Sequence, residues 1–340
     1  MRNKRLIGAY LLVLLLLAGS FIYEKVDAVQ QQKNEVKTVG VLQYVSHPAL
    51  DEIYRGIKAG LKENGYTVGK NVKILYQNGQ ADQSKLATMS QQLVEKNPDA
   101  LIGIATPAAQ SLANATTKIP LVLGAVTDPV SSGLVKSMKA PSGNITGVSD
   151  QPAIGAQLSL AKKLIPDAKT VGILYSSTED NSLSQVKQAE KEAKALGLNT
   201  KRYAVPSSNE LSQTVQVMGG KVDFIYIPLD NTIANAMQTV INVANKEGLP
   251  VIPSVDTMVE QGGLATIGIN QYELGVESGK MTADILSGKS ETASTPVYTF
   301  KDGDTIINTE QAKKLGITIP DNLKKEAKLV TDTTVKEEEK

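Results

Sequence analysis

The sequence KTVGVL at residues 37–42 returns as KTVGIL at residues 169–174, and this repetition decides the fold. Further matches follow in the same order and at nearly constant spacing: NVK (71–73) with NTK (199–201), PDALIGI (98–104) with VDFIYIP (222–228), and IPLVL (119–123) with LPVIP (249–253). In each copy, short apolar runs alternate with stretches of helical periodicity, which is typical of a parallel sheet covered by helices on both faces. The chain is therefore predicted to be α/β, with two doubly wound parallel-sheet lobes.

Segments outside the two copies predict that the chain passes between the lobes more than once. PSGNITGVSDQPA (141–153) joins the copies, and a strand (262–270), a helix (272–288) and a pair of short strands (296–300 and 305–309) follow the second copy. Multiple crossings form a hinge about which two lobes can close. We predict that lobe 1 comprises residues 37–146 and 268–294, and that lobe 2 comprises residues 147–267 and 295–330.

The two ends of the chain differ in composition from the lobes. The basic sequence MRNKR precedes LIGAYLLVLLLLAGSFIY (6–23), which carries no charge. This pattern predicts either a signal peptide or an uncleaved signal anchor over residues 1–28, and both would export the rest of the chain to the cell surface or periplasm. Residues 29–36 are interpreted as a linker, and residues 331–340 as a disordered tail.

The composition excludes several classes of function. The sequence has 36 basic and 35 acidic residues, with a formal net charge of +1, so it lacks the positive charge typical of a nucleic-acid partner. It contains no Cys, and its one His is His47. Thiolate chemistry and His-rich metal sites are therefore excluded, and a Ser-His-acid triad is disfavoured. We expect neither an enzyme nor a bound cofactor or metal.

The candidate binding residues follow the predicted strands. In open α/β sheets, ligands bind beyond the carboxyl ends of the strands, so we expect the two lobes to face each other across a cleft lined by these positions. The first copy contributes Tyr44, Ser46, Thr106, Thr127 and Asp128. The second copy contributes Ser176, Asn181, Asp230, Asn231, Ser254 and Asp256.

Two equivalent positions in the repeat differ in charge, because Thr106 of the first copy corresponds to Asp230 of the second. A helix N-terminus with a hydroxyl favours a ligand carboxylate, whereas an acid favours a ligand ammonium group. This asymmetry suits a zwitterion such as an amino acid. Helix capping explains Asp128, Asp230 and Asp256 equally well, since Asp is preferred at that position. Tyr44 fits either a buried core or an aromatic contact with the ligand, and His47 is interpreted as a surface residue.

Four segments resemble those of a known family: LGAVTDPVSSGLV (123–135), PSGNITGVSD (141–150), YIPLDNT (226–232) and GGLATIGINQYELGVESGKMTADILSG (262–288). They are similar to extracytoplasmic solute-binding proteins of ABC transporters with the type-I periplasmic-binding-protein fold, and most similar to its streptococcal tryptophan-binding branch. The resemblance covers about residues 37–325. It implies that the ligand is an amino acid with an aromatic side chain. It also implies two partners, a membrane permease and its cytoplasmic ATPase.

These observations lead to one function and one alternative. The first is a solute-binding protein, expected to be a monomer, that closes on an amino acid and presents it to the permease. Its mechanism would be a population shift, in which the ligand favours the closed state. The alternative is a receptor ectodomain that has the same lobes and senses a small solute.

Overall fold

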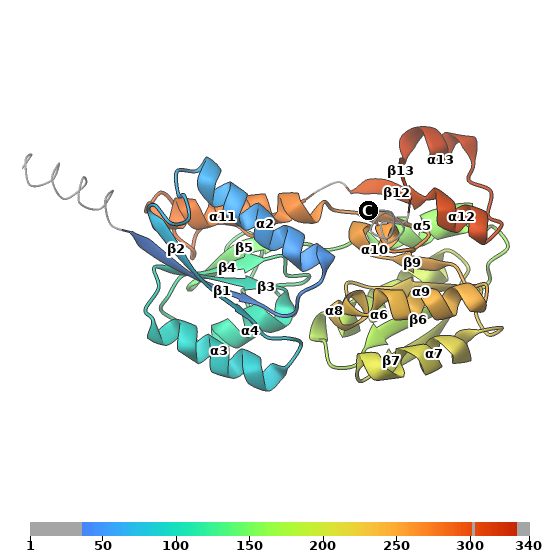
Figure 1. Ribbon diagram of the computed structural model, residues 1–340, viewed down its shortest axis with the longest axis horizontal. Helices are drawn as coiled ribbons and strands as arrows, with labels where there is room; N and C mark the ends of the chain where they lie inside the picture. Colours follow the sequence, from blue (N-terminus) through green and yellow to red (C-terminus); the bar gives the residue numbers. More distant parts are fainter. Residues whose placement is uncertain (1–35, 301–302, 332–340) are drawn as a thin grey trace, which may run out of the picture.

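Two lobes lie side by side in the computed structural model, which describes residues 36–300 and 303–331 (Figure 1). The predicted signal or anchor (1–28), almost all of the linker and almost all of the C-terminal tail lie outside the described residues. Among the helices that are described, none combines the length and the apolar character needed to cross a membrane.

Lobe 1 is built on a six-stranded sheet in which all neighbouring strands are parallel, as the sequence predicts. Helices α2 (Pro48–Glu63) and α11 (Gln271–Leu286) lie over one face, and α3 (Gln83–Glu95) and α4 (Thr106–Ala115) over the other (Figure 1). Because both faces are covered, a central strand such as β3 is buried at every residue. In order across the sheet, the strands are β11 (Tyr298–Thr299), β5 (Ile145–Ser149), β4 (Leu121–Gly124), β3 (Ala100–Ile104), β1 (Lys37–Gln43) and β2 (Val72–Asn78).

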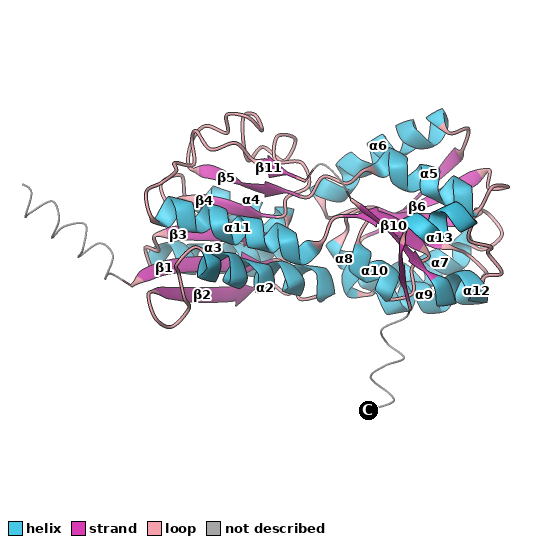
Figure 2. Ribbon diagram, turned by 90° about the horizontal axis from the view of Figure 1, so that it is seen from above, coloured by secondary structure: helices cyan, strands magenta, loops and turns pink. Residues whose placement is uncertain are grey.

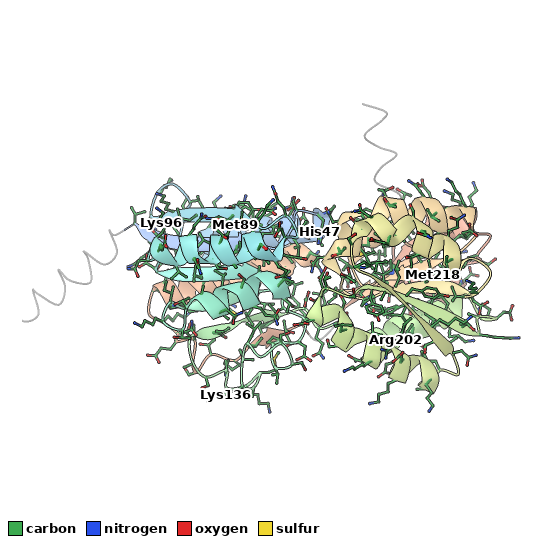
Figure 3. The ribbon with its side chains drawn as sticks, turned by 90° about the horizontal axis from the view of Figure 1, so that it is seen from below. His47, Met89, Lys96, Lys136, Arg202 and Met218 are labelled. Atoms are coloured by element: carbon green, nitrogen blue, oxygen red, sulfur yellow. The ribbon has the colours of Figure 1, made fainter. Side chains whose placement is uncertain are left out.

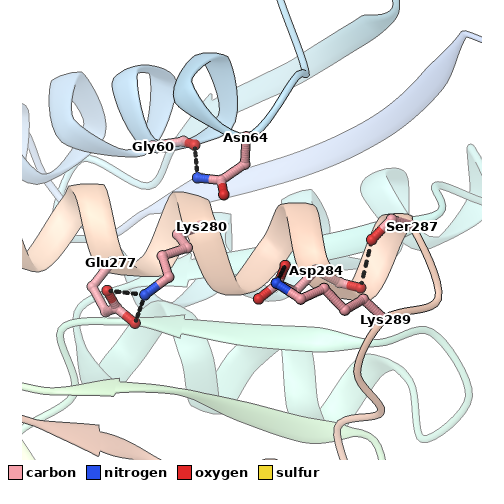
Figure 4. Close-up of polar contacts among 7 residues, drawn as sticks. All are labelled: Gly60, Asn64, Glu277, Lys280, Asp284, Ser287 and Lys289. Atoms are coloured by element: carbon pink, nitrogen blue, oxygen red, sulfur yellow. Dashed lines mark hydrogen bonds and ion pairs between the residues drawn. The ribbon is translucent and has the colours of Figure 1, made fainter.

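Helices α2 and α11 touch through their backbones. Gly56 and Gly60 of α2 face Gly275 and Gly279 of α11, and a Cβ atom on any of the four would overlap backbone atoms of the opposite helix. Figure 4 shows the two helices side by side, with the side-chain amide of Asn64 donating to the carbonyl of Gly60 at 2.8 Å. Residues far apart in the sequence therefore form one tightly packed layer of lobe 1.

Lobe 2 contains a parallel four-stranded sheet and a smaller three-stranded sheet. The larger sheet has the order β7 (Asn199–Val205), β6 (Thr170–Ser176), β8 (Phe224–Ile227) and β9 (Val251–Pro253). In the smaller sheet, β12 (Asp304–Asn308) lies between β10 (Ala265–Gly268), to which it is antiparallel, and β13 (Lys328–Val330).

The helices of lobe 2 form one apolar cluster on each side of the larger sheet. On one side lie α5 (Ile154–Leu164) and α6 (Asp180–Ala195), joined by α12 (Thr309–Lys314) and α13 (Asp321–Glu326). On the other side lie α7 (Leu211–Met218), α8 (Asn231–Asn235), α9 (Met237–Lys246) and α10 (Asp256–Glu260).

The internal repeat appears as a shared strand order. The order β2-β1-β3-β4 in lobe 1 matches β7-β6-β8-β9 in lobe 2, with helices in corresponding places along the chain. The fold class predicted from the repetition is confirmed. The carboxyl ends of both sheets point to the junction between the lobes, which is where the candidate residues were expected to meet (Figure 2).

The chain passes between the lobes at three places: after β5, after β10 and between β11 and β12. The predicted division puts residues 147–149 and 298–299 in lobe 2, whereas the structure pairs them within the sheet of lobe 1. The predicted pairing of the two last short strands is wrong, because β11 pairs with β5 and β12 pairs with β10. The two strands cannot pair with each other because they lie on opposite sides of the hinge, β11 in the sheet of lobe 1 and β12 in the smaller sheet of lobe 2.

Candidate functional site

Two small adjoining cavities lie where the lobes meet, with volumes of about 30 and 40 Å³. We call the first the interlobe cavity, which is lined by His47, Ala49, Leu50, Ala105, Thr106, Ala125, Thr127, Asp150, Asn181, Leu229, Asp230, Asn231, Ala234, Val255 and Gln271. We call the second the hinge cavity, which is lined by Asp150, Gln151, Pro152, Ala153, Leu229, Ser254, Ile267, Ile269, Gln271, Phe300 and Gly303. Asp150, Leu229 and Gln271 border both, so the two cavities are parts of one site.

Lobe 1 turns two uncapped helix N-termini to the interlobe cavity. Helix α2 starts after His47 and helix α4 after Ala105, and neither of these residues makes a side-chain capping bond. Thr106 opens α4 with its side chain buried at the cavity wall. The first N–H groups of a helix carry partial positive charge and need acceptors. This side of the cavity therefore suits a carboxylate.

Two alanines at the tips of lobe 1 strands have an unusual backbone. Ala105 follows β3 with φ 72°, and Ala125 follows β4 with φ 62°. Residues other than glycine rarely adopt positive φ, and such strain is concentrated at functional sites. Both alanines line the interlobe cavity, and the conformation lets the chain turn sharply from each strand tip along the cavity wall.

Lobe 2 places acids where lobe 1 has uncapped helices. Asp230 precedes α8 and is buried. Its Oδ1 accepts from the backbone N–H of Ile233 at 3.0 Å, and its Oδ2 accepts from the N–H of Ser176 at 2.6 Å and the hydroxyl of Ser182 at 2.8 Å. Burial, together with the charge of Glu179, raises the pKa of Asp230. Asp230 thus acts as a helix cap that ties α8 to β6.

Glu179 is a second buried acid at this edge and also serves α8. Its Oε1 accepts from the N–H and the hydroxyl of Thr232, both at 2.8 Å. Its Oε2 accepts from the side-chain amide of Asn231 at 2.6 Å and from the N–H of that residue at 3.2 Å. Two carboxylates thus satisfy the first N–H groups of one short helix, so this side of the cavity is acidic.

Two buried acceptors in the cavity wall have no hydrogen-bond partner among the described residues: Oδ1 of Asp150 and Oδ1 of Asn181. The amide of Asn181 donates to the carbonyl of Leu229 at 2.7 Å, which leaves its oxygen free. Burial raises the pKa of Asp150 to about 6, although a bond from Thr127 opposes this shift. Buried polar atoms are nearly always paired, so these two oxygens point to a missing donor.

The lobes also contact each other directly. Nε2 of His47 lies 3.2 Å from Oδ1 of Asn231, and the amide of Gln110 in α4 donates to Asp180 of α6 at 3.4 Å. Ala49 in the first turn of α2 packs with the apolar cluster of lobe 2. The surface position predicted for His47 is wrong, because lobe 2 covers it; it lies at the junction in Figure 3 and is 6% exposed.

Of the residues predicted from the sequence, six border the site. The interlobe cavity is lined by Thr106, Thr127, Asn181, Asp230 and Asn231. Ser254 borders the hinge cavity, where its hydroxyl lies 2.9 Å from that of Tyr226 and 3.0 Å from the carbonyl of Ile227. The rule that ligand sites follow strand ends therefore brings residues from both lobes together.

The other five predicted residues are turned away from both cavities, each toward a partner in its own surroundings. The hydroxyl of Ser46 donates to Asp51, and that of Ser176 pairs with Thr178. Asp128 accepts from the N–H of Ser131 at 3.0 Å, and Asp256 from that of Thr257 at 2.8 Å. Tyr44 is buried and makes a side-chain hydrogen bond with Thr232, so it does not stand against either cavity as an aromatic platform.

Asp150 and Gln271 border both cavities but were not among the predicted residues. Asp150 ends the motif GVSD directly after β5, and Gln271 opens α11. Both lie in segments that the sequence identifies as hinge crossings, so their side chains were assigned no binding role. The signal that could have found Asp150 is its place after a buried strand, the same rule that identified Thr127 after β4.

Replacing Asp230 by asparagine should lower the stability of the ligand-free chain by roughly 2–3 kcal/mol, because the new NH₂ group would face the N–H of Ser176 and leave two buried donors opposed. Urea unfolding followed by circular dichroism measures the change. Ser182→Ala is the matched control, since it removes one donor to the same oxygen and should cost about 1 kcal/mol. If the Asp230→Asn chain were as stable as the wild type, Asp230 would not act as a structural cap, and its contact with the ligand would explain its place in the cavity.

A family model described as ABC transporter substrate binding protein matches residues 38–331. A relative from Clostridioides difficile (strain R20291), named a tyrosine-binding protein, is 38% identical over 279 residues, covering 82% of this chain and 81% of its own. This chain belongs to the ABC transporter substrate binding proteins. The resemblance seen in its motifs is confirmed, and as a member of this family the chain is a binding protein and not an enzyme.

Two solved structures allow the lobes of this substrate binding protein to be compared. A domain from Streptococcus pneumonia in complex with L-Trp is 50% identical, with a TM-score of 0.84 over 86% of this chain and 99% of the other. A ligand-free, open substrate binding protein with adhesive properties from Clostridium difficile is 36% identical, with a TM-score of 0.68 over 88% and 100% of the two chains. The overall arrangement is thus closer to the complex than to the open form.

Proposed function

We propose that this protein is the solute-binding component of an ABC importer and captures an aromatic amino acid, tryptophan or tyrosine, between its lobes. The observation that carries the proposal is the polarity of the interlobe cavity. Two uncapped helix N-termini of lobe 1 face it, together with two buried oxygens, of Asp150 and Asn181, that find no donor within residues 36–300 and 303–331. A zwitterion meets both needs at once.

The carboxylate of the ligand would lie against lobe 1. There it would accept from the first N–H groups of α2 and α4, and the hydroxyls of Thr106 and Thr127 could add further donors. Pro48 and Pro107 occupy first-turn positions of these helices. Because proline has no backbone N–H and a fixed φ, fewer N–H groups need an acceptor from the ligand, and the turns are rigid. Hydrogen bonds to a charged group contribute about 1.5–3 kcal/mol each.

The ammonium group would lie against Asp150 and Asn181. Asp150 is the cavity acid whose carboxylate keeps an unpaired oxygen, whereas Asp230 has three donors within lobe 2. We therefore assign the ammonium contact to Asp150, with Asn181 as the second acceptor. Since Asp150 borders both cavities, the carbon skeleton can extend from it along apolar walls that include Leu50, Leu229 and Val255.

The arrangement of the lobes supports a site that encloses its ligand. The lobes are joined beside the cavities by direct bonds such as that of His47 with Asn231, and the match to the L-Trp complex exceeds that to the open relative. Relatives named for tyrosine and crystallised with tryptophan support the aromatic class. In such a mechanism the solute shifts the population toward the closed state.

Partners and location follow from membership in the family. A substrate binding protein of an importer acts with a membrane permease and its ATPase, and delivers solute from outside the cytoplasm. We propose that this chain acts there as a monomer, with residues 1–28 serving as its signal or anchor.

L-Tryptophan or L-tyrosine at one hundred times its Kd should raise the melting temperature by about 5–10 °C, since ligand binding then adds about 2.7 kcal/mol to the stability. Tryptamine lacks the carboxylate and indole-3-propionate lacks the ammonium group, so each should bind at least tenfold more weakly than tryptophan. Because the sequence contains no Trp, indole fluorescence reports only the ligand. If neither amino acid shifts the melting temperature, or if tryptamine matches tryptophan, the proposed function is wrong.

A further inference from the structure

The single histidine of the chain sits where the lobes close. His47 precedes α2 of lobe 1, lines the interlobe cavity and is covered by lobe 2. Its Nε2 lies 3.2 Å from Oδ1 of Asn231, the residue that opens α8 of lobe 2. This bond exists only while the lobes are together, because the two residues belong to different lobes.

The direction of the bond is set by Glu179. The side-chain amide of Asn231 donates to Glu179 at 2.6 Å, so the oxygen of Asn231 is the atom that faces the imidazole. His47 must then donate from Nε2, which leaves Nδ1 as the ring nitrogen without the proton in the neutral form. A neutral imidazole with its proton on Nε2 satisfies this geometry fully.

A second proton on the ring would be unfavourable in the closed form. It would place a positive charge at the N-terminus of α2, where the helix already has partial positive charge, and would bury that charge between the lobes. Consistent with this, burial lowers the pKa of His47 to about 4 in spite of the bond with Asn231 and the nearby Asp51.

The acids around His47 compensate this charge only weakly. Asp51, on the same helix, is engaged by Ser46 and Gln43. Glu179 is engaged by Asn231 and Thr232. The other acids on α2 are Glu52 and Glu63, and those on elements near it are Asp230 before α8, Asp256 and Glu260 on α10, and Glu273, Glu277 and Asp284 on α11.

We propose that neutral His47 is a positioning residue that latches lobe 1 to Asn231 of lobe 2, so that acidification opens the lobes and releases the solute. The identity of the solute rests on the proposed function, whereas the contact between His47 and Asn231 does not depend on which solute binds. In the open form His47 faces solvent and titrates with the ordinary pKa of about 6.5. Below that pH the ring must lose a proton before the lobes can close.

The sign of the effect follows from linkage. The closed form binds fewer protons than the open form between the closed-state and open-state pKa values of His47, so closure weakens as the pH falls through about 6.5. For an open-state pKa of 6.5 and a closed-state value of about 4, the titration of His47 alone should lower solute affinity roughly thirtyfold from pH 7.5 to pH 5.

The test compares the wild type with His47→Gln, which keeps a donor for Asn231 but does not titrate. Tryptophan affinity is measured at both pH values by indole fluorescence. Whatever its affinity at pH 7.5, the variant should lose roughly thirtyfold less affinity than the wild type between pH 7.5 and pH 5, because Asp150, whose pKa burial raises to about 6, titrates in both proteins. The other acids are unchanged in the variant, so the difference between the two profiles isolates His47. Equal pH profiles for the two proteins would overturn the latch.

A second measurement needs no solute and separates the latch from the proposed function. Cysteines placed at Gln110 and Asp180, which contact each other across the lobes, can be joined by a short thiol cross-linker because the sequence has no other Cys. One labelled histidine gives one imidazole signal in the nuclear magnetic resonance spectrum. The pKa of His47 should be near 4 in the cross-linked chain and near 6.5 without the cross-link. The same pKa in both would contradict the proposal, whether or not an amino acid binds.

Discussion

Gly275→Ala is expected to unfold lobe 1 or to destabilise the chain by about 3 kcal/mol or more, because its Cβ has no space to occupy. The new atom would overlap the carbonyl oxygen of Ile53 and lie 2.8 Å from the carbonyl carbon of that residue. Both contacts are with backbone, which cannot rotate away as a side chain can, so α2 and α11 would have to separate. Urea unfolding followed by circular dichroism measures the loss.

The matched control is Gly155, a glycine in the first turn of α5. A Cβ on Gly155 of α5 would come within 2.8 Å of the carboxylate of Glu192, which lies at the end of a flexible side chain. Gly155→Ala should therefore leave the stability unchanged or raise it by up to about 1 kcal/mol, as the helix propensity of alanine predicts. Equal stability of the Gly275 and Gly155 variants would show that the helices are not held by backbone contact.

Asp150→Asn should weaken the binding of tryptophan by roughly 30- to 150-fold, the equivalent of about 2–3 kcal/mol for one charge-assisted hydrogen bond. The ligand-free chain should become more stable near pH 7, since burial raises the pKa of Asp150 to about 6 and its ionised form is therefore unfavourable in the fold. Affinity and stability would thus change in opposite directions, which a capping residue cannot produce. Fluorescence titration and thermal unfolding give the two readings.

Asp128→Asn provides the comparison on the same side of lobe 1. Asp128 lies beside Thr127 in the sequence, but its carboxylate caps the turn at Ser131 and lines neither cavity. Its substitution should change tryptophan affinity by less than twofold and leave the stability nearly unchanged, since Asn caps about as well as Asp. If Asp128→Asn weakened binding as much as Asp150→Asn, the assignment of the ammonium contact to Asp150 would fail.

The strand order of both lobes could be predicted because the two copies of the repeat can be aligned with each other from the sequence alone. A parallel strand buried on both faces needs a continuous apolar run, and two such series in one order imply the same sheet twice. The end of each strand is then known to within a few residues. This is why Thr106 and Asp230 were found, although they are far apart in the sequence and lie in different lobes.

What each side chain does at the end of its strand could not be predicted. Thr127 and Asp128 are neighbours that were both predicted to bind the ligand, but the turn directs one to the cavity and the other to Ser131. The burial of His47 depends on lobe 2, which no local pattern around Pro48 describes. Asp150 was missed because a crossing that contains Pro, Gly and Asn is typical of a hinge, and only its tertiary surroundings reveal the unpaired oxygen.

The contact of α11 with α2 imposes an order on biosynthesis. A ribosome delivers the chain from its N-terminus, so the glycine-lined groove on α2 has no partner until residues 271–286 have emerged. By then almost all of the second repeat has been made, and the strands β12 and β13 that complete the second lobe are still to come. A cut between the two repeats would put α2 and α11 on separate chains, so neither half would contain the whole of lobe 1.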